Sequence, residues 1–302
     1  MKRKGIILAG GNGTRLHPIT ISVSKQLMPV YDKPMIYYPL SVLMKMGIDE
    51  ILVITTPHDS AAFQKLLEDG SKWNMSLSYM VQANPDGLAQ ALILAEEFLG
   101  DHPSVLILGD NLFFGEGFDS IAMKTNSCKD GATIFGYPVH NPEDYGVVGF
   151  DKNRNVISLK EKPNFPASNY AITGLYFYDN RASMFARKIC PSARGELEIT
   201  DLNRTYMDCG DLNVELLGRS TTWLDTGTHR ALLRAANFVS ILEEQQGVRI
   251  CCPEEIAFCN GWINVEQLRN VIEPLKKSEY GQYLLKILER ENKGLKLSSN
   301  MQ

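Results

Sequence analysis

The first 110 residues alternate between short apolar runs and helical patterns, and this alternation constrains the fold more than any other feature of the sequence. The strand-like runs lie at residues 5–9, 51–55, 77–81 and 105–108. Apolar side chains recur at helical spacing over 36–44 and 88–99, and Gly47 can supply the left-handed residue that ends the first helix. The pattern predicts an α/β fold: a Rossmann-like, open, mostly parallel sheet flanked by helices.

The second half of the chain is organised differently. Strand candidates with few helices between them lie at residues 132–137, 146–150, 156–160, 171–178 and 214–217. They predict a mixed extension of the sheet that covers a ligand. Helical spacing returns after residue 225. We therefore expect an α/β core over 1–228, divided into 1–130 and 131–228, and a helical C-terminal appendage over 229–302.

The composition indicates a small-molecule ligand. The chain has 302 residues, 44% of them hydrophobic, which is enough for a sizeable core. A formal charge of −4 without a basic patch argues against nucleic acid and anionic membranes as partners. The sequence has no run of about 18 apolar residues that would span a membrane, and its six cysteines form no C-x-x-C pair. We expect a cytoplasmic protein.

A glycine-rich loop follows the first strand, where an open parallel sheet has its ligand crevice. The loop carries Gly10, Gly11, Gly13, Thr14 and Arg15. Glycines let backbone N–H groups approach a polyphosphate, and an arginine fork can neutralise phosphate oxygens. A dinucleotide fold requires a third glycine where this chain has Leu16, and the sequence contains no P-loop motif. The loop therefore predicts a phosphate site of another kind.

The motif that extends from this loop resembles a known family. Residues 10–16 and Lys25 match the G-G-x-G-T-R-L…K signature of the sugar-nucleotide pyrophosphorylase family. The resemblance is greatest to its glucose-1-phosphate thymidylyltransferases, and it continues in order through residues 85–90, 109–111, 145–148, 161–163, 194–201 and 223–229. Several long matches in order are far more specific than one glycine loop.

The resemblance implies a nucleotidyl transfer. In that reaction dTMP passes from dTTP to α-D-glucose 1-phosphate, giving pyrophosphate and dTDP-glucose for deoxysugar biosynthesis, with Mg²⁺ as the cofactor. The sugar phosphate is already an anion near neutral pH, since its second pKa is about 6, so no general base is required. The protein has to position the reactants and neutralise their charge.

The resemblance also implies roles for individual residues. Asp110 and Asp225 would hold the metal, and together with Arg15, Lys25 and Lys162 they are the expected catalytic residues. The expected nucleotide-binding residues are Gly10, Gly11, Gly13, Thr14, Arg15, Lys25, Gln26, Gln82, Gly87 and Asp110. The expected sugar-phosphate-binding residues are Asn111, Gly146, Glu161, Lys162 and Ile172. Without the resemblance, Asp110 would be interpreted as a turn residue and Asp225 as a helix N-cap.

Two other functions and the assembly remain open from the sequence. A relative that uses UTP or another hexose 1-phosphate differs at few contacts, since thymine and uracil differ by one methyl group worth about 1 kcal/mol. A non-catalytic nucleotide-sugar sensor is disfavoured because all five expected catalytic residues are present. The resemblance implies a homotetramer, with the C-terminal region, including 251–256, in subunit contacts and regulation. Trp223 and the aromatic run 176–178 are interpreted as core.

Overall fold

The computed structural model describes residues 1–11 and 13–292. Residues 293–302, the end of the expected C-terminal appendage, lie outside the described residues. The strands are β1 (Lys4–Ala9), β2 (Pro29–Val30), β3 (Lys33–Pro34), β4 (Glu50–Thr55), β5 (Ser76–Val81), β6 (Ser104–Leu108), β7 (Asn111–Phe114), β8 (Ala132–Pro138), β9 (Gly146–Phe150), β10 (Val156–Glu161), β11 (Tyr170–Tyr178), β12 (Leu212–Leu216) and β13 (Thr222–Asp225). The α-helices are α1 (Tyr37–Lys45), α2 (Ser60–Leu67), α3 (Gln90–Leu94), α4 (Glu96–Leu99), α5 (Glu116–Ser127), α6 (Ala182–Ala186), α7 (Ile199–Asp208), α8 (His229–Gln246), α9 (Pro253–Cys259), α10 (Val265–Ile272) and α11 (Glu279–Asn292). Short 3-10 helices include η1 (Thr14–Leu16) and η3 (Lys25–Leu27).

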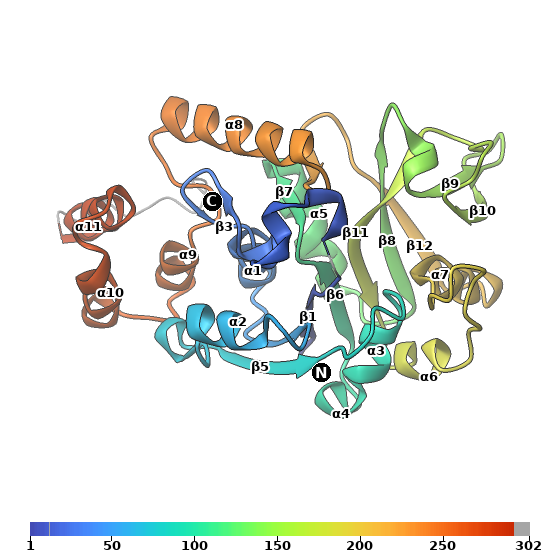
Figure 1. The fold of residues 1–302 in the computed structure, drawn as a ribbon, viewed down its shortest axis with the longest axis horizontal. Coiled ribbons are helices and arrows are strands. Elements are labelled where there is room, and N and C mark those ends of the chain that lie inside the picture. The colour runs from blue at the N-terminus through green and yellow to red at the C-terminus, as the bar shows by residue number, and fades with distance from the viewer. Residues whose placement is uncertain (12, 293–302) are drawn as a thin grey trace.

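A nine-stranded sheet forms the centre of the molecule (Figure 1). Its main path is β10-β9-β11-β6-β1-β4-β5, and β8 pairs with both β11 and β12. Strands β6, β1, β4 and β5 are parallel, whereas β11 is antiparallel to β6, β8 and β9. The prediction of an open, mostly parallel (mixed) sheet flanked by helices is confirmed. Because β1 and β6 are neighbouring parallel strands, the loops that follow them leave the sheet at the same edge.

The central strands are apolar on both faces because helices cover both faces. Ile7 and Val53 belong to a core shared with α1, α2, α5 and the C-terminal helices α9, α10 and α11. Their neighbours Ile6 and Leu52 point the other way, into a core shared with α3, α4, α6 and α7. This period-two alternation explains why the sequence shows continuous apolar runs at these strands.

The C-terminal quarter is helical in the described residues, as predicted. The longest helix, α8, packs on the β2–β3 hairpin through a small separate core that includes Val30, Tyr38, Ala235 and Val239. Figure 1 shows α8 running across one end of the molecule, with α10 and α11 beyond α9. Among the described residues, no helix is long and apolar enough to cross a membrane.

The observed secondary structure differs from the expected one in detail. The single helix expected over 88–99 is two short helices, α3 and α4, which meet at Ala95. The region after residue 131 has few helices, as expected, but the positions of α6 and α7 between β11 and β12 were not predicted. The signal for α7 was present in the sequence, because Ile199, Leu202 and Tyr206 recur at helical spacing and are buried on one side. The short pair β7–β13 was not predicted at all.

Candidate active site

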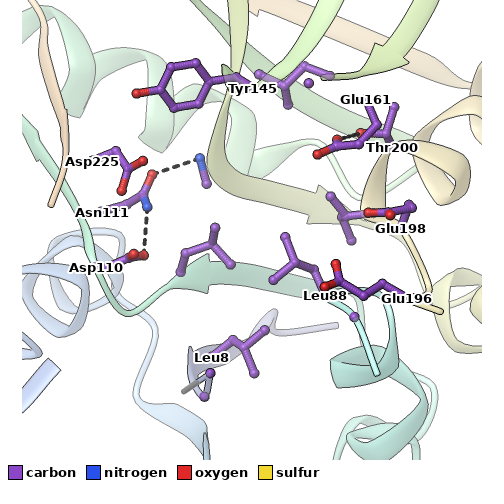
Figure 2. A pocket seen from close by; sticks show the side chains of 18 of the residues that line it. Leu8, Leu88, Asp110, Asn111, Tyr145, Glu161, Glu196, Glu198, Thr200 and Asp225 are labelled. Carbon is purple, nitrogen blue, oxygen red and sulfur yellow. Dashed lines mark hydrogen bonds between the residues drawn. The ribbon is translucent and has the colours of Figure 1, made fainter. Parts of the chain in front are cut away.

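A pocket of about 420 Å³ lies where the loops after β1 and β6 leave the sheet. Of the expected site residues, all but Gly13 and Thr14 line it. Figure 2 shows its layout: Asp110, Asn111 and Asp225 on one side, and Glu161, Thr200 and Glu198 on the opposite side. The sheet topology therefore brings residues that are more than 200 positions apart in the chain to one cavity.

The glycine-rich loop is fixed from beneath by Gln26. The Gln26 side chain is buried, accepts a hydrogen bond from Ser24 Oγ at 2.7 Å and donates one to the Gly10 carbonyl at 3.3 Å. Gly11 takes a positive φ of 94°, which glycine adopts without strain. Gly13 and Thr14 lie in the turn that begins η1, beside the pocket but off its lining.

Two carboxylates and a lysine form the acidic end of the pocket. Asp110 follows β6, and Asp225 ends β13, where it pairs in register with Asn111. The Lys25 ammonium donates to Asp110 Oδ2, and Asn111 Nδ2 donates to Asp110 Oδ1 at 3.0 Å. Burial opposes the ionisation of Asp110, but the Lys25 charge prevails and lowers its pKa. The asparagine amide and the lysine thus hold Asp110 as an anion.

Asp225 has the opposite electrostatics. Burial, followed by the negative charge of Asp110, raises the pKa of Asp225 to about 6. Its one hydrogen bond given by the described residues comes from the Gly227 N–H at 3.1 Å. Helix α8 is capped instead by Thr228, whose side chain accepts from the Ala231 N–H at 3.2 Å. Asp225 is therefore not the N-cap of that helix, and its carboxylate faces the pocket beside Asp110.

This pair suits a hard divalent cation. Magnesium commonly takes one or two protein carboxylates and completes its octahedron with water and phosphate oxygens. The negative charge of Asp110 opposes the ionisation of Asp225, and a cation between the two carboxylates would offset that repulsion. In the described residues, no group of three or more His, Cys, Asp or Glu side chains is arranged to hold a metal. The donor set therefore fits Mg²⁺ better than a zinc-type site.

The opposite end of the pocket carries Glu161 and Lys162 from the end of β10. Thr200 Oγ1 donates to Glu161 Oε2 at 2.6 Å, which fixes that carboxylate. Lys162 adopts a positive φ of 41°, and its backbone N–H donates to the Tyr145 carbonyl at 3.0 Å. A left-handed conformation costs a non-glycine residue about 1 kcal/mol, and such residues cluster at functional sites. Ile172 is buried at this end.

Gln82 and Gly87 form a third region of the pocket. Gln82 follows β5, and its backbone N–H donates to the Thr55 carbonyl at 2.8 Å. The ends of β4 and β5 therefore set the position of Gln82. Gly87 has a φ of 110°, and a Cβ atom there would lie 2.4 Å from the backbone of Leu197. Only glycine fits this close approach. The loop is held to Leu197 by a backbone hydrogen bond of 2.7 Å to Asp86.

Several lining residues were not predicted as site residues. Arg194 donates to Glu198 Oε1 at 2.8 Å and lies 3.6 Å from Glu161 Oε1, so it joins two of the acidic side chains. The others are Leu8, Pro85, Leu88, Leu108, Asp144, Tyr145, Gly174, Tyr176, Glu196, Glu198, Ile199, Thr200 and Trp223. The matched segments 194–201 and 223–229 contained part of this signal. Trp223 and Tyr176 are buried, as predicted for core residues, yet both also line the pocket.

Comparison with known proteins identifies the family. Residues 4–241 match the family model described as nucleotidyl transferase. The chain is 58% identical over 289 residues to a glucose-1-phosphate thymidylyltransferase of Xanthomonas campestris pv. campestris, covering 96% of this chain and 98% of the relative. It is 53% identical over 287 residues to one of Mycobacterium tuberculosis, covering 95% and 99%.

Solved structures agree with the sequence relatives. A Bacillus anthracis protein named as a putative glucose-1-phosphate thymidylyltransferase superposes with a TM-score of 0.73 at 40% identity, over 78% of this chain and 94% of that one. A UDP-glucose pyrophosphorylase shares the fold, with a TM-score of 0.69 at 24% identity, over 79% and 98%. The chain therefore belongs to the nucleotidyl transferase family and, within it, to the glucose-1-phosphate thymidylyltransferases.

Proposed function

We propose that this protein transfers dTMP from dTTP to α-D-glucose 1-phosphate and releases dTDP-glucose and pyrophosphate. The observation that carries the proposal is that one pocket has two separate charged ends, with Asp110 and Asp225 at one and Glu161 at the other. Lys25 lies at the first end, bonded to Asp110, and Lys162 follows Glu161 at the second. A triphosphate with a cation suits the first end, and a sugar phosphate suits the second. The names of the relatives supply the identity of the two substrates.

Residues of the pocket bind and orient the triphosphate of one substrate and the 1-phosphate of the other. The backbone of Gly10 and Gly11 and the side chains of Arg15 and Lys25 hold the triphosphate. Lys162 holds the sugar 1-phosphate, and Glu161 accepts hydrogen bonds from sugar hydroxyls. A phosphate oxygen of the sugar then attacks the α-phosphorus in line with departing pyrophosphate. Arg15 and Lys25 stabilise the charge that grows on the leaving group.

Gln26, Gly13 and Thr14 act on the nucleotide side in a less direct way. Gln26 supports the Gly10 carbonyl, and Gly13 with Thr14 forms the turn that carries Arg15. On the sugar side, Asn111, Gly146 and Ile172 complete the wall of the pocket. When bound at Asp110 and Asp225, Mg²⁺ supplies charge neutralisation to the phosphate oxygens.

The roles of the three segments of the chain, its assembly and its cellular compartment are part of the same proposal. Residues 1–130 carry the nucleotide side and 131–228 most of the sugar-phosphate side, while 229–302 contributes subunit contacts and regulation in a homotetramer. The protein acts in the cytoplasm, and its product enters deoxysugar biosynthesis. Use of UTP in place of dTTP is the main alternative, since the pocket's polar groups contact features that thymine and uracil share.

Product analysis tests the proposal. Purified protein is incubated with dTTP, glucose 1-phosphate and Mg²⁺, and the products are separated by anion-exchange chromatography. The expected products are dTDP-glucose and pyrophosphate in equal amounts, with none formed when EDTA replaces Mg²⁺ or when the sugar phosphate is omitted. Binding of dTDP-glucose without any turnover would instead favour a nucleotide-sugar sensor.

A further inference from the structure

The amide of Gln82 is held by a chain of hydrogen bonds that ends on a carboxylate. Gln82 Nε2 donates to Gln90 Oε1 at 2.6 Å and to the Gly87 carbonyl at 3.2 Å. Gln90 Nε2 in turn donates to Asp86 Oδ2 at 2.8 Å. Neither Gln90 nor Asp86 lines the pocket.

The chemistry of the last member sets the direction of every bond in this chain. An ionised carboxylate can only accept, so Asp86 requires the NH₂ group of Gln90. The carbonyl oxygen of Gln90 then faces Gln82 and accepts a hydrogen bond from the NH₂ group of Gln82. The Gly87 carbonyl accepts from the same NH₂ group. Both donor hydrogens of Gln82 are therefore committed to the protein.

The oxygen of Gln82 is left for a ligand. Among the described residues no donor is bonded to Gln82 Oε1, although the residue is only 6% exposed and lines the pocket. A Cβ atom on Gly10 would lie 2.9 Å from this oxygen, so a glycine at position 10 keeps it accessible. The described residues likewise provide no acceptor for the Gly87 N–H. An acceptor and a donor thus lie close together in the pocket.

We propose that Gln90 and Asp86 are positioning residues that lock the Gln82 amide with its oxygen toward the nucleotide base, and thereby select bases with an N3–H donor. Thymine and uracil present N3–H beside a carbonyl oxygen, which matches Gln82 Oε1 and the Gly87 N–H. Cytosine presents an unprotonated N3, which would face the Gln82 oxygen with no hydrogen between them. The inference rests on the proposed nucleotide-binding function of this pocket.

Two kinds of variant test the direction of the chain. Gln90→Leu removes both side-chain bonds of residue 90 and leaves only the longer 3.2 Å bond to the Gly87 carbonyl to orient the Gln82 amide. The double variant Asp86→Asn, Gln90→Glu exchanges the groups: the carboxylate introduced at position 90 would accept from both neighbours and still require the NH₂ of Gln82. Gln64→Leu is the matched control, because Gln64 makes a single side-chain bond of 3.2 Å to Ser60 on exposed helix α2.

The readout is the preference for dUTP over dCTP, a pair that differs only at the N3 and C4 positions of the base. It is measured as the ratio of kcat/KM values with glucose 1-phosphate and, separately, as the ratio of Kd values by calorimetry without the sugar phosphate. We expect a wild-type preference of at least about 100-fold, since an unpaired polar group strongly penalises the wrong ligand. In Gln90→Leu the preference for dUTP over dCTP should fall about tenfold. In the double variant and in Gln64→Leu it should stay within about threefold of the wild-type value.

An unchanged preference in folded Gln90→Leu would overturn the inference, and so would an equal loss in the double variant. If Gln90→Leu does not fold, Gln90→Met gives the same test with an unbranched side chain. The two ratios separate this inference from the proposed function. Preferential binding of dUTP without turnover would support the hydrogen-bond chain and reject the catalytic function. Turnover without a preference between dUTP and dCTP would support the catalytic function and reject the hydrogen-bond chain.

Discussion

The indole Nε1–H of Trp223 donates a 2.7 Å hydrogen bond to Asn111 Oδ1, which joins β13, the strand that ends at Asp225, to β7, the strand that follows Asp110. The same oxygen accepts from the Gly174 N–H at 3.0 Å. With both donors on its oxygen, Asn111 presents its NH₂ group to Asp110. A residue on β13 thus helps to orient a carboxylate that follows β6.

Removing the indole donor should therefore weaken metal binding. In Trp223→Phe the Asn111 amide keeps only the Gly174 bond, and we expect the affinity for Mn²⁺, measured by EPR without substrates, to fall about threefold to tenfold. Trp262→Phe is the control, because Trp262 packs against the core outside the lining of this pocket. Equal Mn²⁺ affinity in the wild type and Trp223→Phe would show that the indole N–H is not required for Asn111 to orient Asp110.

Asp225→Asn should leave the protein folded but reduce Mg²⁺-dependent turnover by about 100-fold or more, because a neutral amide is a poor ligand for a hard cation. Steady-state kinetics over a Mg²⁺ titration measure the effect. Circular dichroism checks the fold. Near-normal turnover in Asp225→Asn would remove this residue from the metal site.

The raised pKa of Asp225 also predicts a pH dependence of stability in the metal-free protein. Its pKa of about 6 in the folded state exceeds the ordinary value of 3.8, so the folded protein binds more protons between these values. Stability from this group is full below pH 3.8 and is lost as the pH rises through about 6. In urea unfolding with EDTA, wild type should lose stability relative to Asp225→Asn between about pH 4 and 7. If the unfolding free energies of the two proteins changed in parallel with pH, the raised pKa of Asp225 would be contradicted.

Lys162→Ala should raise the KM for glucose 1-phosphate by about tenfold or more and leave the Kd for dTTP unchanged, because its charge acts on the sugar phosphate alone. Lys160→Ala is the matched control, since Lys160 is an exposed neighbour on β10 outside the pocket. Initial rates and nucleotide titrations separate the two constants. A comparable loss of dTTP affinity would mean that Lys162 contacts the nucleotide instead.

Lys33 tests a purely structural element. Its side chain is 1% exposed, and its ammonium group pairs with Asp32 and with Glu243 of α8, so it joins the β2–β3 hairpin to that helix. Lys33→Met leaves Glu243 with Arg249 as its remaining cation and should cost about 3 kcal/mol of unfolding free energy. Lys65→Met on exposed α2 should cost less than about 0.5 kcal/mol in the same urea titration. Equal stability of the two variants would contradict this role.

The parts of the fold that follow from local patterns were predictable from the sequence. Continuous apolar runs indicated the parallel strands, and Gly47, with a φ of 74°, ends α1 as expected. The β7–β13 pair was not predictable, because four-residue strands carry little periodicity and pair across more than 100 residues. Helix α7 was not predicted, because most of its ten residues are polar or charged and its apolar stripe of Ile199, Leu202 and Tyr206 is narrow.

From the residues alone, the glycine-rich loop after the first strand and Asp110 after an apolar strand indicated a ligand site. Most of the other expected pocket residues followed from the family resemblance. The rest depends on tertiary contacts. Nothing in the sequence shows that Gln90, outside the lining, is bonded to Gln82, or that Trp223 is bonded to Asn111. Such partners come from different elements, so their roles emerge only from the three-dimensional arrangement.

The most direct test of the central claim is pyrophosphate release by the purified protein with glucose 1-phosphate and Mg²⁺, with dTTP, UTP, ATP, CTP and GTP compared in parallel. We expect the fastest release with dTTP, and none without the sugar phosphate. Absence of release with every triphosphate, despite measurable nucleotide-sugar binding, would contradict the claim.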